Sequence, residues 1–237
     1  MNKVVKDAQE ALSDIFDGAT IMVGGFGLCG IPENLLRALA QKGTKNLTLI
    51  SNNAGTDEHG IGLLIKNGQV KKMIMSYGGE CKAFEEKVLQ NKLEVEWNPQ
   101  GTLAERIRSG GAGIGGFYTP TSYGTSIAEK KESRQMDGQW YVFEKALKAD
   151  FSFVKAYKGD LLGNLEYRKT SRNFNAVMAT AGKVTIAEVE HLMEIGDLHP
   201  DHIHTPGIYI KRIFEGTHYQ KPIEKRTVRP ETMVSGA

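Results

Sequence analysis

Short apolar runs alternate with amphipathic stretches over the first half of the chain. The apolar runs have the length and composition of β-strands and fall at residues 20–23 (TIMV), 47–50 (LTLI), 72–75 (KMIM) and 93–97 (LEVEW). Helical patterns lie around 6–16, 32–41, 60–66 and 81–90. Strands that alternate with helices predict βαβ units and a mostly parallel sheet. We therefore expect an α/β fold, with an open sheet between flanking helices.

Several helix boundaries carry explicit signals. Pro32 stands where the second helix should start, and proline suits the first helical position. Gly43 follows the apolar stripe of that helix and suits its C-terminal cap. Thr102 and Glu105 have the spacing of a capping box, which predicts a further helix over 103–108.

The second half of the chain is less regular. Asp137-Gly138 stands between polar and aromatic runs and predicts a β-hairpin, hence a small antiparallel appendage near 130–144. Strands are expected at 151–155 and 184–186, a helix at 173–181, and either element at 208–213. We expect one domain over 1–237, with a flexible tail from about 230 to 237.

Composition narrows the class of protein. The 237 residues carry a formal net charge of +2 without long runs of either sign, which argues against a nucleic-acid or membrane-surface partner. No apolar run approaches the roughly 20 residues that span a bilayer, and the charged N-terminus lacks a signal-peptide core. Only Cys29 and Cys81 are cysteines, without metal-type spacing. These features predict a cytoplasmic protein.

A glycine-rich loop follows the first strand, at residues 24–32 (GGFGLCGIP). Gly25, Gly27 and Gly30 match the dinucleotide-binding pattern GxGxxG. That hypothesis needs an acidic residue at the end of the second strand, where this chain has Asn52 and Asn53. We therefore favour a loop that approaches another ligand, although each glycine can also be explained by a tight turn alone.

Gln100 lies between the fourth strand and the helix that follows it. Ligands of open parallel sheets bind beyond the carboxyl ends of the strands, so an amide donor here can meet an oxygen that gains negative charge. The position alone also fits a glutamine that merely satisfies turn backbone. The glycine-rich stretch 110–116 is either a surface loop or a mobile wall of the cleft, and glycine content predicts that it is not helix interior.

The loop and the glutamine segment together resemble a known family. Residues 17–26 (DGATIMVGGF), with Gly30 and Pro32, resemble the signature of the first, or A, chain of family I coenzyme A transferases. Residues 99–105 (PQGTLAE) and 110–113 (GGAG) are similar to the same chain. Residues 27–30 (GLCG) and 208–229 point to the succinyl-CoA:3-ketoacid branch, with the acetate-type branch as alternative.

The resemblance implies a mechanism and a partner. Gln100 would polarise the thioester carbonyl, and a glutamate nucleophile would come from a B subunit in an A2B2 or similar assembly. The isolated chain should then be inactive. The resemblance implies acyl-CoA and a keto acid such as acetoacetate as substrates, and no cofactor or metal. The residues expected to contact substrate are Gly24, Gly25, Phe26, Gly27, Gly30, Asn52, Asn53, Gly101, Gly110, Gly111 and Gly113.

Other chemistry-bearing residues have plainer interpretations. Glu33 and Glu80 are acids near glycine clusters, but we do not expect either to be the nucleophile. His199, His202 and His204 do not match a zinc pattern and predict a polar loop. Cys29 is expected to be a small buried thiol. A nucleotide-binding oxidoreductase, a sugar-phosphate isomerase or deaminase, and a non-catalytic binding module are the remaining alternatives.

Overall fold

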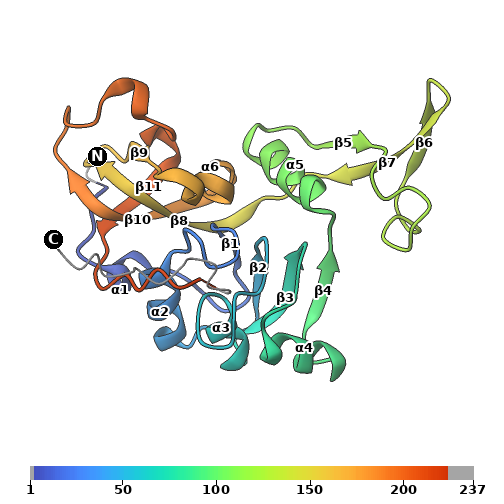
Figure 1. Ribbon diagram of the computed structural model, residues 1–237, viewed down its shortest axis with the longest axis horizontal. Helices are drawn as coiled ribbons and strands as arrows, with labels where there is room; N and C mark the ends of the chain where they lie inside the picture. Colours follow the sequence, from blue (N-terminus) through green and yellow to red (C-terminus); the bar gives the residue numbers. More distant parts are fainter. Residues whose placement is uncertain (1–2, 224–237) are drawn as a thin grey trace, which may run out of the picture.

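A central parallel sheet organises the chain in the computed structural model, which describes residues 3–223. Seven strands lie in the order β11-β10-β8-β1-β2-β3-β4, and every neighbouring pair is parallel (Figure 1). Short β9 (Leu165–Glu166) adds an antiparallel pair to β8. The seven strands are β1 (Thr20–Val23), β2 (Leu47–Ile50), β3 (Val70–Met75), β4 (Glu94–Trp97), β8 (Ala149–Asp160), β10 (Gly182–Met193) and β11 (Ile210–Glu215). The expected α/β architecture is confirmed.

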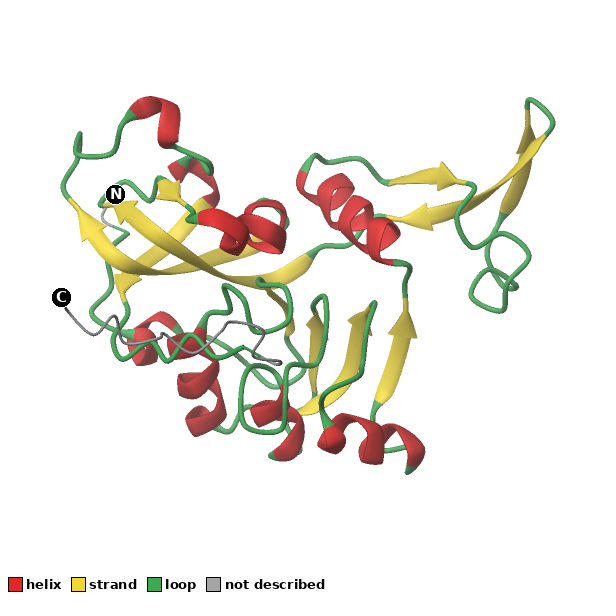
Figure 2. Cartoon of the chain, in the orientation of Figure 1, coloured by secondary structure: helices red, strands yellow, loops and turns green. Residues whose placement is uncertain are grey.

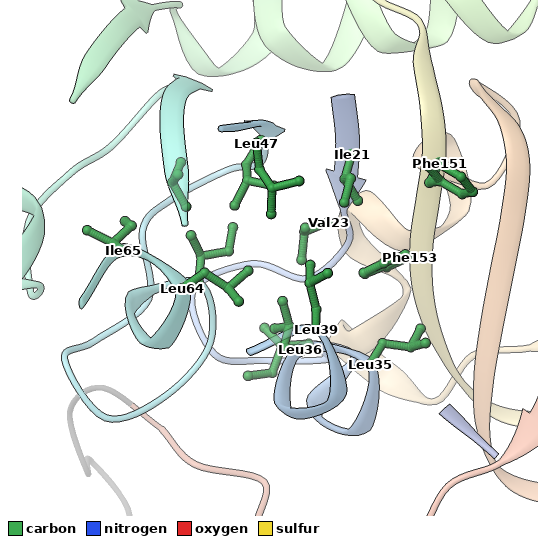
Figure 3. Packing of buried hydrophobic residues seen from close by; sticks show 14 of the residues in the cluster. Ile21, Val23, Leu35, Leu36, Leu39, Leu47, Leu64, Ile65, Phe151 and Phe153 are labelled. Atoms are coloured by element: carbon green, nitrogen blue, oxygen red, sulfur yellow. The ribbon is translucent and has the colours of Figure 1, made fainter. Parts of the chain in front are cut away.

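Both faces of the sheet are buried, as the continuous apolar runs predict. Alternate residues of β1 point to opposite faces, so Ile21 and Val23 enter one core while Met22 enters the other. The first core packs against α1 (Ala8–Ala11), α2 (Glu33–Lys42), α3 (Gly62–Lys66) and α4 (Lys82–Leu89), as Figure 3 shows for α2 and α3. The second packs against α5 (Gln100–Gly111) and α6 (Asn173–Met178).

The second helix has nearly the predicted ends. Gly43 is its C-terminal cap, in the left-handed conformation with φ of 73°, and its N–H bonds to the carbonyl of Leu39. Pro32 is the N-cap residue, so the helix begins one position later than predicted, at Glu33. The N-terminal helix is shorter than the predicted 6–16 and forms a single turn, α1.

The helix after β4 differs from its prediction at both ends. It begins at Gln100, with Pro99 as N-cap, so the capping box of Thr102 was wrong and Thr102 is buried. The first helical hydrogen bond runs from the N–H of Leu103 to the carbonyl of Pro99, at 2.8 Å. The helix also continues through Gly110 and Gly111, so the prediction that 110–116 is not helix interior was wrong for these two residues. Gly110 packs so closely that a Cβ there would stand 1.8 Å from the carbonyl oxygen of Leu147, which requires a glycine at this position.

Strands β8 and β10 are much longer than predicted, with 12 residues each. Buried polar residues such as Lys155 and Glu188 interrupt their apolar runs, which hid their full length. The ambiguous stretch 208–213 belongs mainly to β11, after the 3-10 turn η3 (Gly207–Tyr209). Two other 3-10 turns are η1 (Lys169–Arg172) and η2 (Pro200–His202). Helix α6 ends three residues before the predicted limit of 181.

A small antiparallel sheet projects from the body, as Figure 2 shows. It consists of β5 (Gly116–Thr119), β6 (Ser133–Met136) and β7 (Gln139–Lys145), in the order β5-β7-β6. Asp137 and Gly138 join β6 to β7 with φ of 48° and 78°, which confirms the predicted hairpin. The predicted tail, 230–237, lies outside the described residues. Within residues 3–223, no helix is long and apolar enough to cross a bilayer.

Candidate active site

A cavity of about 460 Å³ opens beyond the carboxyl ends of the strands. Parallel strands bring their carboxyl ends to one edge, and the segments after β1, β2 and β3 meet there with the start of α5. Its lining residues are Phe26, Gly27, Asn52, Asn53, Ser76, Tyr77, Glu80 and Gln100. Five residues of the predicted site, Phe26, Gly27, Asn52, Asn53 and Gln100, are thus brought together.

A chain of hydrogen bonds sets the orientation of Gln100. The backbone N–H of Gly27 donates to Asn52 Oδ1 at 3.0 Å, so Asn52 must turn its Nδ2 the other way. That Nδ2 donates to Gln100 Oε1 at 2.9 Å, and the hydroxyl of Ser76 donates to the same oxygen. Since the backbone N–H of Gly27 can only donate, it fixes the orientation of the Asn52 amide, and Asn52 in turn fixes that of the Gln100 amide.

The consequence is a free donor in the cavity. Gln100 Oε1 is occupied by two hydrogen bonds, while its Nε2 donates to no acceptor in residues 3–223. Gln100 is also in the first turn of the twelve-residue α5, where the helix dipole is positive. An amide N–H held at the positive end of a helix suits an oxygen on which negative charge develops.

The remaining predicted contact residues lie elsewhere. Gly24 and Gly25 are buried, and a Cβ on Gly24 would stand 2.1 Å from Asn175 Oδ1. Gly30 lines a different cavity. Gly101 is exposed beside Gln100 but does not line the cavity.

The glycines at the end of α5 are also apart from Gln100. Gly110 and Gly111 pack against Leu147 and Thr180, and Gly113 follows in a turn with φ of 75°. At about 1.5 Å per residue, Gly110 lies roughly 15 Å along the helix from Gln100. Nothing in this arrangement supports the mobile wall, and the packing gives Gly110 and Gly111 a structural role.

Ser76 and Tyr77 also line this cavity, and the sequence did not lead us to predict them. Both follow β3 directly, and the rule that singled out Gln100 after β4 could have found them. Glu80, which we discounted as a nucleophile, lines the same cavity and is exposed.

The dinucleotide hypothesis fails at the N-terminus of α2. A pyrophosphate would have to bind the free N–H groups of this turn. Instead the buried carboxylate of Glu188 accepts from the N–H of Leu35 at 2.8 Å and from the N–H and side chain of Asn34. Burial raises the pKa of Glu188 to about 7, although those hydrogen bonds act in the opposite direction and lower it. The N–H groups that a pyrophosphate would need are therefore already bound by the chain itself.

Other sequence expectations have mixed outcomes. Cys29 is exposed, so the expected buried thiol was wrong: the loop turns its side chain outward, 3.3 Å from Thr170 Oγ1. Glu33 accepts from the backbone N–H groups of Gln220 and Lys221, both at 2.9 Å, and so anchors the C-terminal segment.

The histidines after β10 make ordinary loop contacts. His204 accepts from the N–H of Tyr167 at 2.9 Å, and His199 accepts from the N–H of Asp201. No group of three or more His, Cys, Asp or Glu side chains in residues 3–223 is arranged to hold a metal ion.

Sequence comparison agrees with this architecture. Residues 5–216 match the coenzyme A transferase family, and the chain belongs to that family. A Bacillus subtilis (strain 168) protein, named as the A subunit of a probable succinyl-CoA:3-ketoacid coenzyme A transferase, is 56% identical over 229 residues. The match covers 97% of this chain and 96% of that one.

Two longer proteins match over about half their length. The mitochondrial succinyl-CoA:3-ketoacid coenzyme A transferase 2A of Rattus norvegicus is 43% identical, over 99% of this chain and 49% of its own. An acyl-CoA transferase from E. coli O157:H7, solved as a thioester complex with CoA, superposes with a TM-score of 0.81 at 24% identity. That match covers 91% of this chain and 47% of the solved chain, and it establishes the shared fold.

Proposed function

We propose that this chain is the A subunit of a heteromeric CoA transferase that moves CoA from succinyl-CoA to a 3-keto acid such as acetoacetate. The names of relatives that match nearly the whole chain support the substrate pair. The observation that carries the catalytic part is the orientation of Gln100, whose Nε2 is left as a donor in the cavity. An acetate-type acceptor is the alternative within the family.

The nucleophile in this proposal is a glutamate of the partner B subunit. Its carboxylate oxygen attacks the succinyl thioester carbonyl and expels CoA thiolate, which leaves an acyl-glutamyl anhydride. The thiolate then attacks the glutamyl carbonyl, forming a glutamyl-CoA thioester and releasing succinate. The acceptor carboxylate reverses these steps and leaves with CoA, so the exchange is ping-pong.

Gln100 contributes during each attack. The thioester oxygen gains negative charge as the tetrahedral centre forms, and the Nε2 of Gln100 is suited to donate to it. Because Asn52 and Ser76 hold Oε1, the amide need not reorient when the charge develops.

Two observations support a second chain. The rat relative has about twice this length, and only 49% of it matches this chain. Phe26 and Tyr77, on the cavity lining, are large exposed aromatics, a type enriched where protein partners dock. The A2B2 stoichiometry and the cytoplasmic location remain predictions.

The test is co-expression with the product of the adjacent open reading frame, followed by an assay of acetoacetate-dependent CoA transfer from succinyl-CoA. We expect activity from the co-purified pair and none from this chain alone. Activity of the lone chain would contradict the shared site. A pair that transfers CoA only to acetate would favour the alternative acceptor.

A further inference from the structure

A second cavity, of about 320 Å³, lies along the other part of the glycine loop. Residues 26 and 27 line the cavity of Gln100, whereas residues 28–31 line this one, and the two cavities share no lining residue. Its other walls are the turn η1, strands β8 and β10, and the C-terminal segment 221–223. Leu28, Ile31, Pro222 and Ile223 give it an apolar side.

The floor of this cavity has more positive than negative charge. The buried ammonium of Lys155 forms an ion pair with Glu190, and Lys221 Nζ lies 2.7 Å from the other oxygen of the same carboxylate. Two lysines therefore share one acid. The second acid of the lining, Glu33, is paired with Arg37 and holds backbone N–H groups, so it does not balance the extra charge.

Arg168 and Lys169 add two further cations at the wall. Neither forms an ion pair with an acid of residues 3–223, and the Arg168 guanidinium lies 5.2 Å from the ring centre of Tyr157. Both side chains are exposed and line the cavity. Two cations on the wall of a cavity that also has an apolar side can recognise an anionic group attached to an apolar body.

We propose that this cavity is a second ligand site, for a short organic carboxylate of roughly four to six carbons. The carboxylate pairs with Arg168 and Lys169, and the carbon chain lies against Leu28 and Ile31. Inorganic phosphate would leave the apolar wall unfilled, which is why the lining favours a carboxylate. Because the assignment follows from the lining alone, it does not depend on the transferase reaction.

Cys29 provides a reporter of occupancy. It lines the cavity and is exposed, whereas the other cysteine, Cys81, is fully buried and burial raises its pKa to about 11. A neutral alkylating reagent such as iodoacetamide should therefore modify Cys29 first. A ligand in the cavity should slow that reaction.

The experiment measures the alkylation rate of the Cys29 peptide by mass spectrometry, in the full chain with any partner that co-purifies, at constant ionic strength. Succinate at about four times its dissociation constant should slow the reaction about fivefold, by mass action. The variant R168Q/K169Q should lose this protection. The matched variant K71Q/K92Q, which removes two exposed lysines elsewhere, should keep it.

Two further variants make the result decisive. Gln100→Ala should keep the protection, because it alters only the first cavity, so a failed transferase assignment would leave this result untouched. Lys169→Gln alone should weaken protection if the double variant does not fold. Absence of protection, equal protection by phosphate, or protection that survives in R168Q/K169Q would each overturn the proposal.

Discussion

Asn52 Nδ2 lies 2.9 Å from Gln100 Oε1, and this contact connects the segment after β2 to the start of α5. The other end of the Asn52 side chain accepts from the backbone of Gly27 in the glycine loop. Asn52 and Gln100 are 48 residues apart in the sequence, and this hydrogen bond fixes the orientation of the Gln100 amide. The donor that faces the cavity is thus positioned before any ligand arrives.

Removing that donor should affect turnover and not assembly. We expect Gln100→Ala, in the co-expressed pair, to lower kcat by roughly 100–1,000-fold, the usual cost of losing one donor to a developing oxyanion. The variant should still co-purify with its partner, because Gln100 is a lining residue and not a core residue. Steady-state kinetics measures the turnover and gel filtration measures the assembly. An unchanged kcat would remove Gln100 from the mechanism.

Asn52→Asp should act through Gln100. The carboxylate would still accept from Gly27 but could no longer donate to Gln100 Oε1, so the Gln100 amide would turn its Nε2 toward it. We expect a loss close to that of Gln100→Ala, and little further loss in the double variant, because both remove the same donor. Asn53→Asp adds the same charge to the cavity without touching Gln100 and should cost less. If the losses of Asn52→Asp and Gln100→Ala were fully additive in the double variant, the two residues would act independently and the prediction would be wrong.

Glu80 tests where the nucleophile lies. It is an acid on the lining of the Gln100 cavity, so it is the rival within this chain to a glutamate from the partner. We expect Glu80→Gln to keep kcat within about tenfold, since a lost nucleophile costs far more. If kcat instead fell to background, with the complex intact, the nucleophile would belong to this chain.

Two glycines that were expected to touch substrate should differ in stability. A Cβ at Gly24 would stand 2.1 Å from Asn175 Oδ1, so Gly24→Ala should lower the free energy of unfolding by about 1–3 kcal/mol. Gly101 is helical, and nothing lies within 4 Å of the place where a methyl group would stand, so Gly101→Ala should raise it by up to about 1 kcal/mol. Urea unfolding of both variants measures the pair. Equal effects would contradict the packing role of Gly24.

The buried Glu188 should make stability fall with rising pH. Its pKa is raised from 4.5 to about 7 in the folded chain, so between these values the folded state binds more protons than the unfolded state. The free energy of unfolding therefore decreases as pH rises from about 4.5 to 7 and levels off above. Glu188→Gln, which cannot titrate, should lack this contribution. Denaturant unfolding of both proteins at pH 5, 6, 7 and 8 tests this prediction. If the free energy of unfolding changed with pH in the same way in both, the prediction would be wrong.

The apolar pattern predicted the strands of the first half well, because β1 and β2 are short and buried on both faces. It failed for β8 and β10, where Lys155 and Glu188 are buried through partners distant in sequence. Part of the cavity lining was predicted: Gln100 and Asn52 follow strand ends, which a sequence reveals. The contact between them, and the packing that explains Gly24, depend on tertiary structure and leave no local signal.

The most direct test of the shared site asks which chain carries CoA. The co-expressed complex is incubated with succinyl-CoA without acceptor, and the intact masses of both chains are measured, with peptide mapping of any modified glutamate. We expect a CoA thioester on the partner chain and none on this chain. A CoA thioester on Glu80, or on any other glutamate of this chain, would contradict the shared site.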